Sequence, residues 1–94
     1  MNLCKINLYV NPAITSHVTI IKSFQKLLKQ KIYVHCVFHV IDVIKESEKA
    51  FTNQVSIIPT IIRTTPGREK RLIGDFSDPQ NILDKLVLPE IPKQ

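Results

Sequence analysis

The two cysteines of this sequence, Cys4 and Cys36, are its best candidates for redox or nucleophilic chemistry. A reactive thiol needs a lowered pKa, which proteins obtain at a helix N-terminus or within a Cys-x-x-Cys motif. Both cysteines instead lie inside apolar, strand-like stretches, and the sequence has no Cys-x-x-Cys. Free cysteines in such places behave as small hydrophobic residues. We therefore expect both thiols to pack in the core, and the sequence leaves any further role open.

Histidines and glycines offer no second route to catalysis. His35 and His39 would stand about 13 Å apart along a strand that rises ~3.3 Å per residue, too far to share one metal ion. We expect them, and His17 near the first helix, to be ordinary titratable residues. Gly67 and Gly74 are the only glycines, so a glycine-rich phosphate loop is excluded. We predict no metal, no cofactor and no enzymatic activity.

Four cations lie close together in the second half of the sequence, at Arg63, Arg68, Lys70 and Arg71. The net charge is +5 and the isoelectric point is about 9.4. This excess of positive charge could attract an acidic partner, or it could serve only to keep the protein in solution. Charge alone does not decide between these two interpretations. Aromatic residues do not alternate with the basic ones, so we expect no nucleic-acid partner.

Length and composition indicate one small domain over residues 1–94, with 44% hydrophobic residues and no tryptophan. A chain of this size buries only about 60–65% of its unfolded surface, so self-association would help it. Lys5 interrupts the apolar N-terminus, which argues against a signal peptide. No stretch approaches the ~20 apolar residues of a membrane helix. We expect a cytoplasmic protein without membrane contact, and a loose tail over about residues 88–94.

The first half of the sequence predicts strand, helix, strand. Residues 3–10 are rich in strand formers. Apolar residues recur every three or four positions over 18–28, which indicates an amphipathic helix capped by Thr15 or Ser16. Residues 32–43 are continuously apolar and β-branched, as in a strand covered on both faces.

The second half predicts a helix, two strands and a last helix. A short polar helix over roughly 44–53 would use Ile44 and Phe51 as its apolar contacts. Strands on either side of Pro66–Gly67 would form a hairpin, with the second strand near 70–74.

The last helix has a clear start signal in Ser77 or Asp78 as cap, followed by Pro79. Asp75 and Asp78 flank this start, and capping accounts for them without chemistry. Its buried stripe would consist of Ile82, Leu83 and Leu86.

The resulting order, β-α-β-α-β-β-α, predicts an α/β protein with a thioredoxin-like sheet. Pro59 supports this prediction because it stands where a central strand begins, although proline gives a strand no N–H donor. Thioredoxin-like domains place a cis-proline before a central strand. Pro59 is our cis-proline candidate.

Four short segments resemble the KaiB proteins of the bacterial circadian clock: LYV at 8–10, VIDV at 40–43, PT at 59–60 and IGDFS at 73–77. The family pattern, LYVAGNTPNS, KVIDVLKNP, ATPTL and RRIIGDLSN, aligns without gaps from about Lys5 to Leu83. The resemblance implies a thioredoxin-like fold without catalytic cysteines. It also implies a second state, β-α-β-β-α-α-β, in which about residues 50–94 rearrange and subunits form tetramers. Pro59 lies in that region and is our candidate for the rearrangement.

The resemblance further implies a non-enzymatic regulator that binds a KaiC-type ATPase and, in cyanobacteria, captures KaiA. Lys70 and Arg71 match the Arg-Arg of the family pattern, and Arg63 matches a lysine that follows ATPTL. With Asp75 of the IGD segment, they form our candidate set for partner or subunit contact.

The sequence departs from the family pattern at several positions. Pro12 replaces a glycine, Ser47 a proline and Gln54 a lysine, and the acidic C-terminal tail is missing. A divergent relative fits either a circadian clock or clock-derived signalling and stress adaptation. A thioredoxin-like thiol oxidoreductase and a docking module for a histidine kinase remain as alternatives. We expect a homo-oligomer, either a tetramer or a dimer, with a KaiA-like protein or a histidine kinase as further partners.

Overall fold

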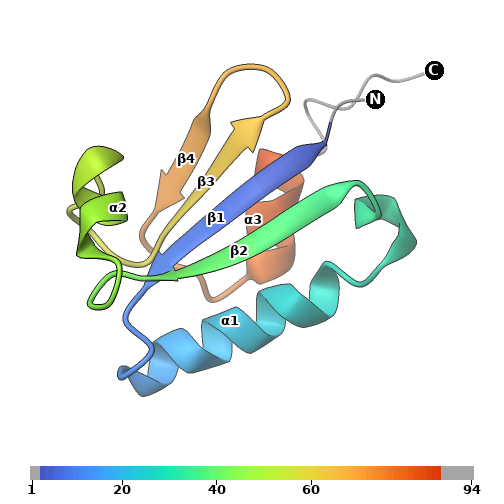
Figure 1. Ribbon diagram of the computed structural model, residues 1–94. Coiled ribbons are helices and arrows are strands. Elements are labelled where there is room, and N and C mark those ends of the chain that lie inside the picture. Colours follow the sequence, from blue (N-terminus) through green and yellow to red (C-terminus); the bar gives the residue numbers. More distant parts are fainter. Residues whose placement is uncertain (1–2, 88–94) are drawn as a thin grey trace.

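The computed structural model describes residues 3–87 and confirms the predicted thioredoxin-like order of elements (Figure 1). The tail expected at 88–94 lies outside the described residues. The elements are β1 (Cys4–Val10), α1 (Thr15–Leu27), the short 3-10 helix η1 (Lys31–Tyr33), β2 (Cys36–Asp42), α2 (Ser47–Thr52), β3 (Thr60–Thr65), β4 (Lys70–Ile73) and α3 (Pro79–Leu86).

The four strands form one sheet in the order β2-β1-β3-β4. β1 pairs in parallel with β2 and antiparallel with β3, and β3 pairs antiparallel with β4. Helix α1 makes the crossover between the parallel strands (Figure 1). None of the helices within the described part of the chain has the length and apolar character needed to span a bilayer.

The helices cover the two faces of the sheet unequally. Successive strand residues point to opposite faces, so Ile6 and Leu8 join the main core beneath α1 and α3, while Tyr9 points the other way. Among residues 3–87, α2 is the one helix that packs on that second face, through Ala50, at one end of the sheet (Figure 1). The rest of this second face, which we call the open face, carries polar side chains such as His39.

The first helix begins differently from the prediction. Ile14 occupies the N-cap position and makes no side-chain cap, and Thr15 and Ser16 already belong to the helix. His17 is buried rather than on the surface, since its Nδ1 accepts a hydrogen bond of 3.1 Å from the Asn11 N–H. The histidine therefore fixes the turn between β1 and α1.

The second strand begins at Cys36, four residues later than predicted. The 3-10 helix precedes it and buries Tyr33, whose hydroxyl accepts a hydrogen bond of 3.0 Å from Gln80 Nε2. Strand β2 is an edge strand with Val37 and His39 exposed on the open face, so the expected cover on both faces is wrong. A continuous run of apolar residues therefore did not distinguish an edge strand from a central strand of the sheet.

The second helix is shorter than predicted, and its expected apolar contacts are wrong. Ile44 and Phe51 are 68% and 86% exposed. Ile44 lies in a turn held by Asp42, whose Oδ1 accepts a hydrogen bond of 2.9 Å from the Ile44 N–H. A helix of six residues presents little surface to the sheet, and Ala50 is its buried residue.

The hairpin and last helix follow the prediction. Gly67 takes a φ of 74°, which suits glycine in the turn between β3 and β4. Asp78 caps α3 by accepting 3.2 Å from the Asn81 N–H, and Pro79 opens the helix. The predicted stripe is buried: Ile82, Leu83 and Leu86. The Ile58–Pro59 and Thr65–Pro66 peptide bonds are both cis.

Candidate partner-binding surface

The basic residues of the β3–β4 hairpin do not form one patch. Along β4, alternation sends Lys70 toward α3 and Arg71 toward α2 on the opposite face. Arg63 of β3 shares the α3 side with Lys70. Three of the four cations that are close in sequence therefore divide between two faces of the sheet, and Arg68 lies exposed in the loop between β3 and β4.

Arg63 is the most buried of these residues, with 1% of its surface exposed. Its NH1 donates a hydrogen bond of 2.8 Å to the Leu86 carbonyl near the end of α3, and its NH2 donates one to the Arg68 carbonyl. A buried charge requires such partners. Arg63 thus joins α3 to the hairpin, and a partner would reach it only if these neighbours moved.

Lys70 and Asp75 lie nearer the surface. Lys70 Nζ donates 3.1 Å to the Lys85 carbonyl in the last turn of α3. Asp75 is exposed beside α1, and its Oδ1 accepts 2.8 Å from the Ser77 N–H. That backbone hydrogen bond lowers the pKa of Asp75 below its ordinary value.

Arg71 is held at the end of α2. Its NH2 donates 2.9 Å to the Asn53 carbonyl and lies 2.8 Å from Glu69 Oε2, and NH1 donates 3.3 Å to the Gln54 carbonyl. The side chain remains 35% exposed. Arg71 is therefore a fixed cation on the open face.

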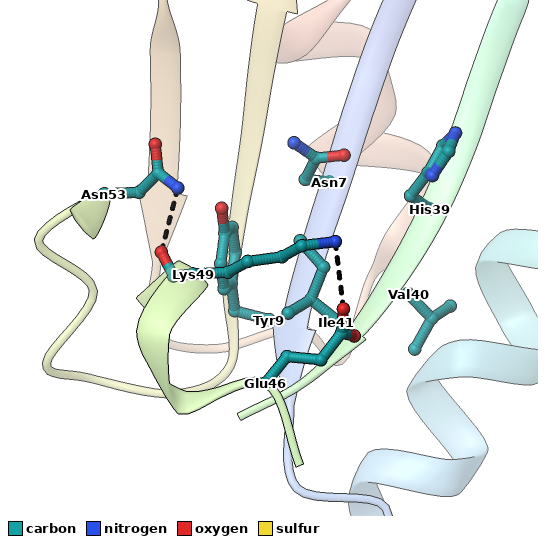
Figure 2. Close-up of a pocket in the computed structure, with 8 residues that line it drawn as sticks. All are labelled: Asn7, Tyr9, His39, Val40, Ile41, Glu46, Lys49 and Asn53. Atoms are coloured by element: carbon teal, nitrogen blue, oxygen red, sulfur yellow. Dashed lines mark hydrogen bonds and ion pairs between the residues drawn. The ribbon is translucent and has the colours of Figure 1, made fainter. Parts of the chain in front are cut away.

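A hollow of about 430 Å³ lies beside α2 on this face (Figure 2). Figure 2 shows the Lys49 side chain extended from α2 over the strands to Glu46, with 2.9 Å between Nζ and Oε1. Asn53 Nδ2 donates 2.8 Å to the Lys49 carbonyl. The lining residues are Asn7, Tyr9, His39, Val40, Ile41, Glu46, Lys49 and Asn53.

Tyr9 belongs to this hollow and is 1% exposed. Burial raises the pKa of its phenol, and the nearby charge of Arg71, followed by that of Lys49, partly opposes the shift. The phenol therefore stays neutral near pH 7. The hydrogen bond from Arg71 to Asn53 and the position of Lys49 in the hollow place both cations on the Tyr9 side of the sheet.

The hollow presents polar and charged groups to the solvent. Within residues 3–87 no three His, Cys, Asp or Glu side chains gather as metal ligands would. The hollow offers the amide groups of Asn7 and Asn53 and the Lys49–Glu46 ion pair, and Arg71 lies outside its lining at the end of α2. Amide and cationic groups of this kind recognise acidic side chains.

Reasoning from the sequence missed most of the hollow. Asn7 and His39 pair across the parallel strands, which puts two polar side chains side by side on one face, but this register is fixed by contacts between distant segments and gave no signal in the sequence. Lys49 on α2 gave no signal, because its approach to the sheet depends on tertiary packing.

The KaiB domain model matches residues 7–88. This chain belongs to the KaiB family. The circadian clock oscillator proteins KaiB of Trichodesmium erythraeum and of Nostoc sp. are each 28% identical over 78 residues. The matched region is 83% of this chain and 75% and 72% of those relatives.

Solved structures show that this KaiB-family chain has the thioredoxin-like fold. The N-terminal domain of Synechococcus elongatus SasA superimposes with a TM-score of 0.63 at 19% identity, covering 98% of this chain and 90% of that one. The thioredoxin Deadhead of Drosophila melanogaster superimposes with a TM-score of 0.74 at 21% identity, covering 90% of this chain and 82% of that one. At such identities the likeness speaks for the fold alone.

Proposed function

We propose that this KaiB-family protein is a non-enzymatic regulator that binds a KaiC-type ATPase, in a circadian clock or in signalling and stress adaptation derived from one. Family membership supports the proposal, since its relatives are circadian clock oscillator proteins. The residues of the hollow form a binding surface, with no nucleophile held by a base among them.

The observation that carries the proposal is Arg71, a cation held in place on the α2 side of the sheet. It donates to the Asn53 and Gln54 carbonyls and pairs with Glu69, so it loses little rotamer freedom when a partner binds. Lys49, on the same side, is 60% exposed and pairs with Glu46. A net charge of +5 draws the protein toward an acidic surface.

The proposal includes self-association and a second fold state. From the resemblance to the KaiB proteins we propose a homotetramer or homodimer. We also propose that about residues 50–94 rearrange in the second state, with Pro59 inside the rearranging part. A KaiA-like protein or a histidine kinase would be a further partner of the complex.

Size-exclusion chromatography with light scattering tests the proposal. The protein is run alone and with a KaiC-type ATPase plus ATP, and we expect it to move into the ATPase peak. The Arg71→Ala variant should bind less, whereas Lys22→Ala on the exposed side of α1 removes the same charge and should bind normally. Circular dichroism checks that both variants fold.

A free protein that never enters the ATPase peak would contradict the ATPase proposal. Equal loss of binding in the Arg71→Ala and Lys22→Ala variants would instead leave only a general charge effect and remove the open face from the proposal. The mass of the free protein, measured in the same run, distinguishes tetramer, dimer and monomer.

An insulin-reduction assay with dithiothreitol addresses the rival, a thiol oxidoreductase. Burial is the main cause that raises the pKa of Cys36 to about 12, so thiolate is scarce at neutral pH. We expect no turnover. Turnover abolished by Cys4→Ser or Cys36→Ser would favour the rival.

A further inference from the structure

Cys4 and Cys36 are direct partners across the parallel strands β1 and β2. The Cys4 N–H donates 2.9 Å to the His35 carbonyl, which fixes this register. Neighbouring strands lie about 4.7–4.9 Å apart, and disulfides join Cα atoms that are usually about 4.4–6.8 Å apart. The backbone therefore holds the two residues at a spacing that a disulfide can bridge.

Both cysteine side chains point to the same face of the sheet. Cys4 belongs to the main core, and Cys36 packs against it. Both are free thiols in this structure. Burial, and next the neighbouring Cys4 thiol, raise the pKa of Cys36 to about 12. The sulfur atoms are thus neighbours, which the separation of the two residues in sequence did not indicate.

The two thiols differ in their access to solvent. Cys4 is 6% exposed, whereas Cys36 is half-buried on the edge strand β2. A small oxidant therefore meets Cys36 first, with Cys4 positioned behind it. An accessible thiol with a second thiol behind it can close a disulfide in two steps, through a sulfenic acid on the accessible sulfur.

We propose that Cys4 and Cys36 form a redox pair that closes a reversible disulfide between β1 and β2 when the protein meets a hydroperoxide. The Cys36 thiol loses its proton, and its sulfur attacks the hydroperoxide. The O–O bond breaks, an alcohol or water leaves, and Cys36 becomes a sulfenic acid. The Cys4 sulfur then attacks that sulfur, the S–O bond breaks, the S–S bond forms, and water leaves with the Cys4 proton. Two thiols have lost two electrons and two protons, and the hydroperoxide has gained them.

The raised pKa of Cys36 gives the reaction a definite pH dependence. Only the thiolate attacks, and well below its pKa the thiolate fraction rises about tenfold per pH unit. Oxidation is therefore slow near neutral pH and faster in alkaline solution. The pair would respond to sustained rather than brief oxidant exposure, and a dithiol reductant would reopen it.

The test treats the reduced, full-length protein with hydrogen peroxide and follows its intact mass. We expect the monomer to lose two hydrogen atoms and dithiothreitol to restore them, with an initial rate that rises about tenfold per pH unit. The closed form should melt higher than the reduced form by on the order of 10 °C, since the bond closes a long loop in the unfolded chain.

Two single variants separate the roles of the thiols. In Cys4→Ser, Cys36 has no resolving partner, so its sulfenic acid should accumulate and react with dimedone. In Cys36→Ser, the buried Cys4 should stay largely unmodified. Addition of oxygen to the unsubstituted chain without loss of hydrogen would overturn the proposal. Disulfides found only between two chains, or a closed form that melts lower than the reduced one, would overturn it as well.

Discussion

At the scale of single residues, Arg63 shows how position decides the role of a charge. Alternation along β3 places it on the same face as Ile61, beneath α3. Its guanidinium donates to the carbonyls of Leu86 and Arg68. Removing a buried charge leaves these acceptors without their donors, which costs more than the net value of the bonds.

We predict that Arg63→Ala lowers the free energy of unfolding by about 2–4 kcal/mol. Urea denaturation followed by circular dichroism measures it. Arg68→Ala is the matched control, because that side chain is exposed while its backbone carbonyl is retained, and it should change stability by less than about 0.5 kcal/mol. Equal stability of the Arg63→Ala variant, together with loss of partner binding, would restore Arg63 as a contact residue.

Asp75 supplies a test of local electrostatics. Its pKa in the folded protein lies below the ordinary value of 3.8, chiefly because the Ser77 N–H donates to its carboxylate. The contribution to stability is therefore present above pH ~4 and is lost as the pH falls through the lower folded pKa. Carboxyl resonances followed by NMR titration measure the shift. Ser77→Ala keeps the backbone N–H, so most of the lowering should survive, and its complete loss would assign the effect to the serine hydroxyl.

At the scale of elements, α3 depends on its first turn. Asp78 is its cap, and the helix carries three of the core residues that lie under the sheet, Ile82, Leu83 and Leu86. We predict that Asp78→Ala lowers the free energy of unfolding by about 1 kcal/mol, whereas Asp78→Asn, which can still accept from the Asn81 N–H, changes it by a few tenths. Chemical denaturation of both variants is the measurement. Equal losses in the two would show that the carboxylate charge, not the cap, stabilises α3.

Strand β4 separates two cations that the sequence places side by side. Lys70 faces α3 and Arg71 faces α2. If the partner docks on the open face, Arg71→Ala should weaken binding by about 1 kcal/mol, roughly fivefold in Kd, while Lys70→Ala has little effect. Titration calorimetry with the KaiC-type ATPase compares the two. The reverse order of effects would move the contact to the α3 side.

At the scale of the whole molecule, the net charge of +5 governs encounter with an acidic partner. We predict that raising the salt concentration from about 0.1 M toward 1 M slows association, because the screening length falls from about 10 Å to 3 Å. Stopped-flow or surface-based kinetics measure the association rate. A rate independent of salt would indicate that apolar contacts dominate.

The sequence by itself determined the order of the main strands and helices, the apolar face of α1, the start of α3 and the resemblance to the family. Those signals are local, since periodicity, capping and turn chemistry act over a few residues. Only the tertiary structure decided that Arg63 is buried, that β2 is an edge and that Cys4 lies beside Cys36. Such neighbours depend on strand register and on which helix covers which face, and both are fixed by contacts between segments that are distant in the sequence.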